Sequence, residues 1–291
     1  MDLTTSWLGL VLGNPLVASA SPANAELDHL LRLEDAGAAA VVLPSLFEEQ
    51  IEAVGSRREA ILSMGVDHSA EAPRHYLPSL HIASGPYGLL PERYLDLVHR
   101  ARDRLSIPVV ASMNGTTPGG WLDHGRRLQQ AGAHALELNL YAVPTDLSES
   151  GSEIEMRYPD IDLHRLTLSS ELVLSQPADM RLPLQWIALL AGRVQASLAA
   201  STGVGNAEQV IKYLYAGADV VMVTSAVLRD GPGCFSRILR GLDEWLETRG
   251  VASLDGIRGA MSFARLKDPG AYTRAQYLAQ LQAWSGRHFD A

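Results

Sequence analysis

Two short turns in the last third of the chain have the residue types that bind a phosphate group in many proteins. The stretch 193–228, RVQASLAASTGVGNAEQVIKYLYAGADVVMVTSAVL, alternates strand and helix patterns, with turns at Thr202-Gly203 and Thr224-Ser225. Small residues let backbone N–H groups converge on a ligand, and the N-terminus of the following helix adds a partial positive charge. The pattern predicts the phosphate-binding end of a (β/α) barrel.

One sequence unit recurs along the chain and predicts how these turns are positioned. The segments LEDAGAAAVVL, LQQAGAHALEL and LYAGADVVMV each run from a helix end through Ala-Gly-Ala into an apolar strand. A glycine after the helix lets the chain turn tightly into the sheet. Continuous apolar strands that alternate with helices indicate a parallel sheet. The predicted fold class is therefore α/β, a TIM-type (β/α) barrel.

Six segments carry the strand pattern, whereas a complete barrel has eight strands. The expected core strands lie near residues 14–19, 39–45, 107–113, 135–141, 193–199 and 219–224. Residues 6–20 are expected to form an N-terminal hairpin that leads into the first of them. Residues 144–192 are polar, acidic in part and broken by prolines, with no strand–helix–strand run of adequate apolar length. We therefore expect an incomplete or atypically closed barrel, with an irregular segment over residues 144–192.

The remaining segments complete the expected domain. Asn24 is expected to cap a helix over residues 25–36. Residues 46–90 are expected to form a helix followed by a lid-like loop rich in Pro, Gly and His. A chain of 291 residues, 47% of them hydrophobic, can bury one large core. A single (β/α)-barrel domain is expected over residues 1–291.

Charge and cysteine content limit the possible partners and compartments. The net charge of −9 argues against a nucleic-acid groove, which needs clustered cations. Cys234 is the only cysteine, so no disulfide can form within the chain. The sequence starts without a basic region followed by a long apolar core, and it has no apolar run of about 18 residues. We therefore expect no signal peptide, no membrane span and a cytoplasmic location.

Motifs along nearly the whole chain resemble the dihydroorotate dehydrogenases, and in particular the bacterial dihydroorotate dehydrogenase-like flavoproteins. The resemblance rests on LGLVLGNPLVASASP, VVLPSLFEEQIE, IPVVASMNGTTPGGW, ELNLYAVPTD and RLPLQWIALLAGRVQASLAASTGVGNAEQVIKYLYAGADVVMVTSAVLRDGP. It implies a (β/α) barrel with FMN at the carboxyl ends of its strands. It also implies an oxidoreductase of pyrimidine metabolism that acts on the CH–CH group of a small dihydropyrimidine-like substrate.

Carried over position by position, the resemblance implies a set of cofactor-binding residues. They are Ala18, Ser19, Ser45, Asn114, Asn139, Thr202, Gly203, Val204, Thr224, Ser225 and Ala226. The last six would hold the FMN phosphate. Asn114 and Asn139 are also the expected substrate contacts, because an amide can both donate to and accept from a pyrimidine or flavin ring.

Three departures from the family pattern leave the catalytic residues unassigned. Pro44 stands where the family carries a lysine, and a second flavin-contacting lysine belongs to the segment that is missing near residues 158–159. Residues 141–143 stand where the family has its Cys or Ser base. The only lysines are Lys212 and Lys267, neither well placed in the sequence to substitute. Impaired turnover is therefore expected.

Two further interpretations remain open. The first is a degenerate barrel that binds flavin weakly or not at all and serves as a structural, regulatory or oligomerising subunit. A missing (β/α) unit would expose edges of the sheet, and a homo-oligomer would cover them. Another phosphate-binding barrel enzyme, such as an isomerase or aldolase, is the second, although the missing lysine argues against Schiff-base chemistry. No metal site is expected, because His68, His75 and His81 fit no standard ligand spacing.

Overall fold

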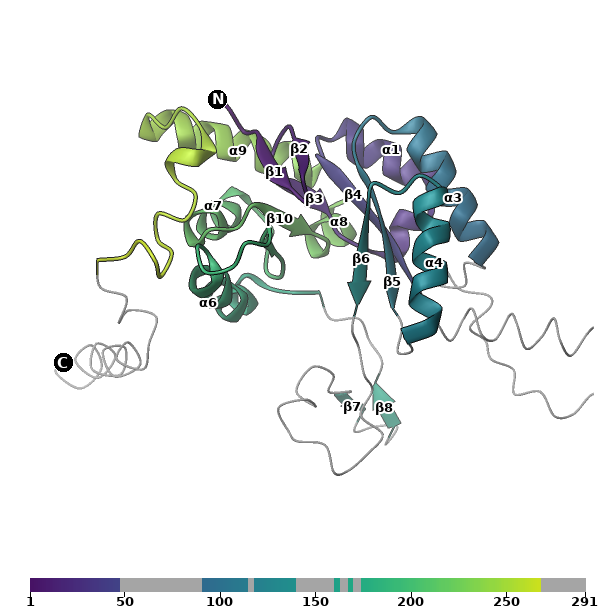
Figure 1. Ribbon diagram of the computed structural model, residues 1–291. Helices are drawn as coiled ribbons and strands as arrows, with labels where there is room; N and C mark the ends of the chain where they lie inside the picture. Colours follow the sequence, from purple (N-terminus) through teal and green to yellow (C-terminus); the bar gives the residue numbers. More distant parts are fainter. Residues whose placement is uncertain (48–90, 115–117, 140–159, 163–166, 170–173, 268–291) are drawn as a thin grey trace, which may run out of the picture.

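Six parallel strands form one curved sheet at the centre of the computed structural model, which describes residues 1–47, 91–114, 118–139, 160–162, 167–169 and 174–267 (Figure 1). The strands are β3 (Leu16–Ala18), β4 (Ala40–Phe47), β5 (Val109–Asn114), β6 (Ala135–Asn139), β9 (Ala199–Ala200) and β10 (Val220–Val223). Their order in the sheet is β6-β5-β4-β3-β10-β9. Every neighbouring pair is parallel. The predicted α/β class is confirmed, and five of the six expected core strands lie where they were predicted.

The sheet curls but does not close within the described residues. Strand β6 pairs with β5 at one end of the sheet, and β9 pairs with β10 at the other. Between β6 and β9 in the sequence, the described residues form the antiparallel pair β7 (Asp160–Asp162) and β8 (Thr167–Ser169), then the 3-10 helix η3 (Pro177–Met180) and helix α6 (Arg181–Leu190). None of these described residues joins the main sheet. The expectation of an incomplete barrel is therefore confirmed.

Helices cover the outer face of the sheet, as the repeated helix–strand unit requires. They are α1 (Leu27–Asp35), α3 (Pro91–Arg104), α4 (Pro118–Gln130), α7 (Ala207–Ala216), α8 (Ser225–Asp230) and α9 (Cys234–Arg249), with short 3-10 turns η1 (Pro22–Ala25) and η4 (Leu254–Gly256). Figure 1 shows α1, α3 and α4 beside β4, β5 and β6, with α6, α7 and α9 toward the other end of the sheet. None of the helices in the described part of the chain is long and apolar enough to cross a membrane.

The N-terminal hairpin closes the amino end of the half-barrel. Strands β1 (Thr5–Trp7) and β2 (Leu10–Leu12) pair antiparallel, as predicted. Leu8 and Gly9 in the turn have φ values of 53° and 76°, the left-handed geometry of a tight two-residue hairpin turn. Trp7 and Leu12 pack against apolar side chains of the sheet. Ligand sites of (β/α) barrels lie at the opposite end, at the carboxyl ends of the strands.

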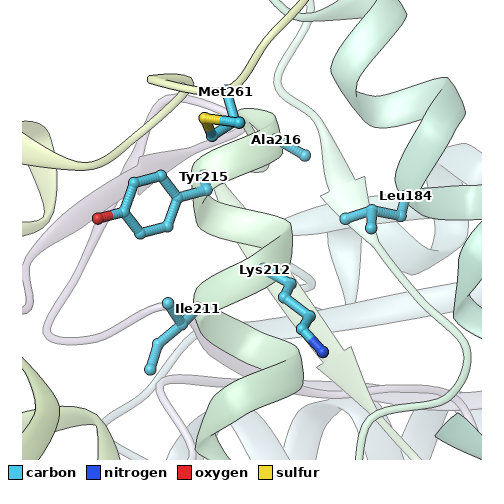
Figure 2. A pocket seen from close by; sticks show the side chains of 6 residues that line it. All are labelled: Leu184, Ile211, Lys212, Tyr215, Ala216 and Met261. Atoms are coloured by element: carbon cyan, nitrogen blue, oxygen red, sulfur yellow. The ribbon is translucent and has the colours of Figure 1, made fainter. Parts of the chain in front are cut away.

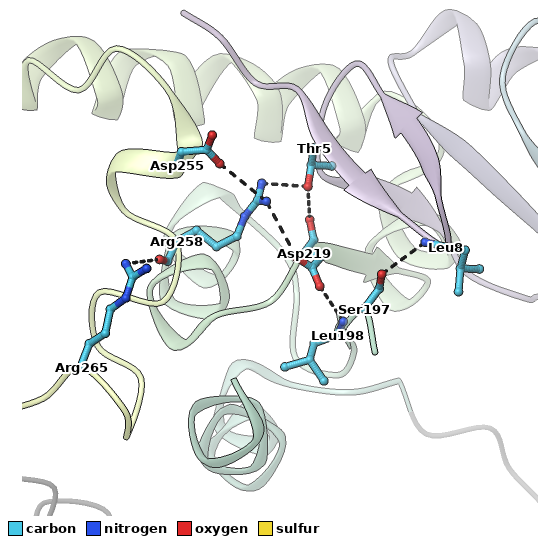
Figure 3. A network of polar contacts seen from close by, with 8 residues as sticks. All are labelled: Thr5, Leu8, Ser197, Leu198, Asp219, Asp255, Arg258 and Arg265. Atoms are coloured by element: carbon cyan, nitrogen blue, oxygen red, sulfur yellow. Dashed lines mark hydrogen bonds and ion pairs between the residues drawn. The ribbon is translucent and has the colours of Figure 1, made fainter. Parts of the chain in front are cut away.

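Polar contacts between distant parts of the chain hold the hairpin in place (Figure 3). The guanidinium Nη2 of Arg258 donates to Thr5 Oγ1 at 2.8 Å, and Thr5 Oγ1 donates to the carbonyl oxygen of Asp219 at 2.8 Å. Arg258 Nη1 also lies 3.8 Å from Asp219 Oδ1. A cavity of about 430 Å³ lies beside this network. Asp219 precedes β10, so the network belongs to the amino end of the barrel, where residues serve stability.

Two expected boundaries are wrong. The strand expected over residues 193–199 overlaps the observed strand β9 only at Ala199. Gly192 has φ +78°, and the Arg193 N–H donates to the Leu190 carbonyl at 2.8 Å. The chain therefore forms a turn at residues 191–193, where a strand was expected to begin. Asn24 does not cap α1, whose N-cap is Glu26. Asn24 is buried, and its amide Nδ2 donates to the carbonyls of Ser19 at 3.0 Å and Val42 at 2.7 Å. It therefore ties the end of β3 to the first half of β4.

Much of two expected segments lies outside the described residues. Leu46 and Phe47 are the last residues of β4 and not the start of a helix, because they continue the ladder with Met113 and Asn114 of β5. The rest of the helix and lid-like loop expected over residues 46–90 lies outside the described residues, as does most of the segment before residue 174. The single domain expected over residues 1–291 stays a prediction.

Candidate functional site

The carboxyl ends of the six strands form one edge of the sheet, and every sequence-predicted site residue lies at this edge. In the order of the sheet they are Asn139, Asn114, Ser45, Ala18 with Ser19, Thr224 with Ser225 and Ala226, and Thr202 with Gly203 and Val204. Parallel strands bring residues from distant parts of the sequence to the same edge. The structure therefore brings the predicted residues together, while their roles toward a ligand stay predictions.

The two predicted phosphate turns meet at Ser175, a residue that the sequence did not indicate. Gly203 N–H donates to Ser175 Oγ at 3.0 Å, and Ser175 Oγ lies 2.9 Å from Ser225 Oγ. Ser175 N–H also donates to Ser225 Oγ at 3.1 Å. Amide N–H and hydroxyl groups are the donors that hold phosphate oxygens at such turns. We call Ser175, Gly203 and Ser225 the donor cluster.

A positive charge lies next to the donor cluster. Arg229 of α8 donates from its guanidinium Nη2 to the Ser175 carbonyl at 3.3 Å. The side chain of Arg229 is exposed, so its charge remains available to a nearby anion. Val204 and Ala226 are buried in the core, so their contribution to a ligand is limited to backbone groups.

Tyr213 fixes the backbone of the Thr202-Gly203 turn. Thr202 has φ +82° and Gly203 has φ +73°, and a threonine in the left-handed region is strained. The hydroxyl of Tyr213 lies 2.7 Å from the Ser201 carbonyl oxygen and 2.8 Å from that of Thr202. Tyr213 is fully buried on α7, so it holds both carbonyls from inside the protein.

Replacing Tyr213 with phenylalanine should weaken phosphate-dependent ligand binding without unfolding the protein. The variant loses the single hydroxyl proton that the two carbonyl oxygens share, which costs about 1–3 kcal/mol for the hydrogen bond left unmade. The strained turn then relaxes, so the affinity for a phosphate-bearing ligand is expected to fall by about 5- to 50-fold. Isothermal titration with FMN measures this loss. Tyr215→Phe on the same helix is the matched control, and equal affinity in both variants would contradict the role of Tyr213.

A second polar cluster lies on β4, β5 and β6. Asn139 Nδ2 donates to Ser45 Oγ and to Ser112 Oγ, each at 3.0 Å, and it lies 3.4 Å from Glu137 Oε1. Ser112 Oγ donates to Glu137 Oε1 at 2.7 Å and lies 2.8 Å from Ser45 Oγ. We call these four residues the serine–glutamate cluster. It combines amide, hydroxyl and carboxylate groups that can both bind a polar ring and accept a proton.

Sequence reasoning found Ser45 and Asn139 of this cluster but missed Ser112 and Glu137. Both missed residues lie two positions before a predicted asparagine, Asn114 or Asn139. Alternate residues of a strand share a face, so this spacing was the signal that could have found them. Asn114 itself is buried and in register with Asn139 on the neighbouring strand.

No lysine in the described residues substitutes for those of the family. Lys212 lies on α7 and pairs with Glu208 on the same helix. It lines a mainly apolar cavity of about 340 Å³ with Leu184 of α6 and Met261 (Figure 2). This cavity lies between outer helices and not at the carboxyl edge of the sheet. Tyr141, Ala142 and Val143, which stand at the place of the family's base, lie outside the described residues.

Among the residues that the structure describes, Cys234 and the groups of possible metal ligands do not supply a catalytic centre either. Cys234 is buried at the start of α9, and burial raises the pKa of its thiol, which disfavours the reactive thiolate. Within the described ranges, no three His, Cys, Asp or Glu residues are grouped so that they could hold a metal ion. The serine–glutamate cluster therefore holds the candidate reactive groups at the carboxyl edge.

The buried tyrosines give a pH-dependent test of this arrangement. Burial raises the pKa of Tyr213 to about 12 and raises the pKa of Tyr94 above its ordinary value. Folding therefore stabilises the protonated hydroxyls, and this contribution is complete below about pH 10 and is lost as the pH rises through about 12. In an ultraviolet titration, two tyrosines should ionise only above about pH 11, together with loss of the circular-dichroism signal. Ionisation of all tyrosines near pH 10 in folded protein would contradict this prediction.

Three curated proteins that match this chain are all dihydroorotate dehydrogenases. The putative dihydroorotate dehydrogenase A (fumarate) of Aeropyrum pernix is 27% identical over 210 residues, which cover 54% of this chain and 68% of that protein. The catalytic subunit of dihydroorotate dehydrogenase B (NAD(+)) of Methanothermobacter thermautotrophicus is 37% identical over 57 residues, 20% of this chain and 19% of that protein. The dihydroorotate dehydrogenase (quinone) of Sphingopyxis alaskensis is 41% identical over 63 residues, 22% of this chain and 18% of that protein. No known family profile matches the chain.

The longest match is consistent with a deleted unit. The alignment with the Aeropyrum pernix protein is 210 positions long, but it includes only 54% of this 291-residue chain, which is about 157 residues. About a quarter of the aligned positions therefore have no counterpart in this chain. The other two matches each span about a fifth of the relative's length.

The fold places this chain among the (β/α)-barrel proteins, with a barrel that lacks part of its circumference. The three relatives support the resemblance that its motifs carry: parts of the chain are similar in sequence to dihydroorotate dehydrogenases.

Proposed function

We propose that this protein is an FMN-binding, dihydroorotate dehydrogenase-like oxidoreductase that acts on a small dihydropyrimidine-like substrate in the cytoplasm. One observation carries the proposal: the donor cluster and the serine–glutamate cluster lie at the same carboxyl edge of one curved sheet. The relatives, named as dihydroorotate dehydrogenases, support the same class of chemistry.

The residues at the edge fit a phosphate. Gly203 has φ +73°, and a Cβ there would lie 2.9 Å from the Gln176 carbonyl oxygen and 2.9 Å from Met180 Cβ. A larger residue would therefore push this turn away from residues 175–180. Glycine allows the close approach that brings the Gly203 N–H to Ser175 Oγ. The three donors now satisfy one another, and a phosphate would give each a charged acceptor, which makes a stronger hydrogen bond. The positive charge of Arg229 adds to this preference.

The residues on the other side of the edge fit a heterocyclic ring. Asn114 and Asn139 supply amides that donate and accept, and Ser45 supplies a hydroxyl. When bound, FMN would accept a hydride from the substrate. The protein groups orient the ring, and a group of the protein must accept the proton that leaves the neighbouring carbon.

Comparing FMN with riboflavin tests the proposal directly. Riboflavin lacks the phosphate, so the donor cluster predicts that FMN binds at least about 30-fold more tightly, equivalent to about 2 kcal/mol. The measurements are the visible flavin absorbance of purified protein and titration of flavin fluorescence. Protein that takes up neither flavin would refute the proposal, and equal affinities would refute the phosphate assignment alone.

A second candidate function is a non-catalytic subunit of an oligomer. Its support is the open sheet together with an exposed apolar stripe on α6, where Leu182 and Trp186 are 64% and 56% exposed and Leu190 follows one turn later. Exposed edges and apolar stripes of this kind call for a partner. Analytical ultracentrifugation distinguishes the homo-oligomer that we expect from a monomer. Flavin-free oligomers would favour this second function over the first.

A further inference from the structure

We propose that Ser45, Ser112 and Glu137 form a proton relay that takes the place of the unassigned catalytic base, with Ser45 taking the substrate proton and Glu137 receiving it. This inference rests on the proposed function, because the proton comes from a dihydropyrimidine-like substrate. Ser45 is the catalytic residue of the relay, whereas Ser112 and Glu137 act through it.

The hydrogen bonds give the relay one direction. Ser112 has a single hydroxyl proton, and it donates this proton to Glu137 Oε1 at 2.7 Å. The contact of 2.8 Å between the two hydroxyls must then be donated by Ser45. Asn139 Nδ2 donates to both hydroxyl oxygens, so it cannot take a proton from either. The protons therefore point from Ser45 through Ser112 to the carboxylate.

Pro44 sets the position of Ser45. The ladder between β4 and β5 pairs Val42 with Val110 and then Ser45 with Ser112, so β4 has one extra residue. Proline has no N–H to donate to the ladder and is tolerated in sheets at bulges. The extra residue shifts the alternation, so that Ser45 faces the same side as Ser112. The proline that replaces the family's lysine thus places a hydroxyl on the inner face.

The middle and the end of the relay have the properties that proton transfer requires. Ser112 is fully buried, and the hydroxyl of Tyr94 binds both its backbone N–H at 3.0 Å and its carbonyl at 3.1 Å. Ser112 is therefore held rigidly between its partners. Glu137 lies on β6 and is only partly buried, so its side chain is partly accessible to solvent that could take the proton on.

The transfer balances in protons and electrons. The C5–H bond of the substrate, next to a ring carbonyl, breaks while an O–H bond forms at Ser45. The original Ser45 proton moves to Ser112 and the Ser112 proton moves to Glu137 Oε1, which becomes a neutral acid. The electron pair stays on the substrate, where the neighbouring carbonyl delocalises it. In the full oxidation this pair would form the new C5=C6 bond, and a bound flavin would supply the acceptor for the C6 hydride.

Deuterium wash-in at C5 tests the relay without net oxidation. Dihydroorotate is incubated in D₂O with the full chain, with and without added FMN, and incorporation is followed by NMR. Wild-type protein should catalyse exchange, and Glu137→Gln, Ser112→Ala and Ser45→Ala should each slow it by about 100- to 10,000-fold, the usual range for a general base. Glu34→Gln is the matched control, since Glu34 also accepts from a serine hydroxyl, that of Ser106 just before β5.

The outcomes separate this inference from the proposed function. Loss of exchange in the three relay variants, with unchanged thermal unfolding and normal exchange in Glu34→Gln, supports the relay. Wild-type protein that incorporates no deuterium, or a Glu137→Gln variant that exchanges as fast as wild type, overturns it. Exchange by protein that retains no flavin upholds the relay and overturns the proposed cofactor. Tight FMN binding without exchange upholds the cofactor and overturns the relay.

Discussion

Replacing Gly203 with valine is expected to abolish FMN retention. A Cβ at this position would lie 2.9 Å from the Gln176 carbonyl oxygen and 3.1 Å from the Met180 backbone nitrogen, and backbone atoms cannot rotate away as a side chain can. Valine is also strongly disfavoured at the φ of +73° that this position adopts. The turn must move away from residues 175–180, which separates Gly203 N–H from Ser175 Oγ and dismantles the donor cluster.

The size of this effect follows from the hydrogen bonds at stake. Two hydrogen bonds to a charged phosphate contribute about 1.5–3 kcal/mol each, so their loss weakens FMN binding by at least about 100-fold. Flavin absorbance of the purified variant, and titration with FMN against riboflavin, measure the loss. Gly231→Val is the control, because Gly231 has φ +76° but nothing within 4 Å of an added Cβ. If both variants retain flavin equally, the phosphate does not bind at this turn.

Gly217→Ala is expected to cause a large loss of stability, about 2–5 kcal/mol. Gly217 ends α7 with φ +116°, and an added Cβ would lie only 2.4 Å from the Cβ of Ala191. The left-handed conformation alone costs an alanine about 1–2 kcal/mol, and overpacking adds about 1–3 kcal/mol. For a domain with a total stability of about 5–15 kcal/mol, such a loss depletes the folded state at growth temperature.

Two variants separate backbone strain from the clash at Gly217. Gly250 ends α9 with φ +64° and nothing within 4 Å of an added Cβ, so Gly250→Ala should lose only the strain component. Adding Ala191→Gly to Gly217→Ala removes the methyl group that clashes, so the double variant should regain stability relative to the single one. Urea unfolding with a common slope measures the differences. Equal losses for Gly217→Ala and Gly250→Ala would show that helix α7 and Ala191 are not packed as described.

The class of fold, and the edge of the sheet that carries the predicted site residues, could be inferred from the sequence alone. Alternation of helix and apolar strand patterns is a local property, so the segments around Val41, Val110 and Val221 could be identified as strands from their own neighbours. The carboxyl ends of parallel strands always meet at one edge, so turn residues such as Gly203 and Ser225 could be placed together before any contact was known. The missing apolar length before residue 193 likewise predicted an incomplete sheet.

The contacts between side chains at that edge could not be inferred in the same way, because they depend on the folded sheet. Ser175 meets Gly203 across 28 residues of sequence, and Asn139 meets Ser45 across 94. Such contacts depend on strand register, and the one-residue bulge at Pro44 decides which face Ser45 occupies. Asn24 shows the same limit. Its side chain was expected to cap the following helix, but it instead donates to the carbonyl of Ser19, just after β3, and to that of Val42 in β4. Periodicity is set by neighbours along the chain, whereas hydrogen-bond partners and register are set by the whole packed sheet.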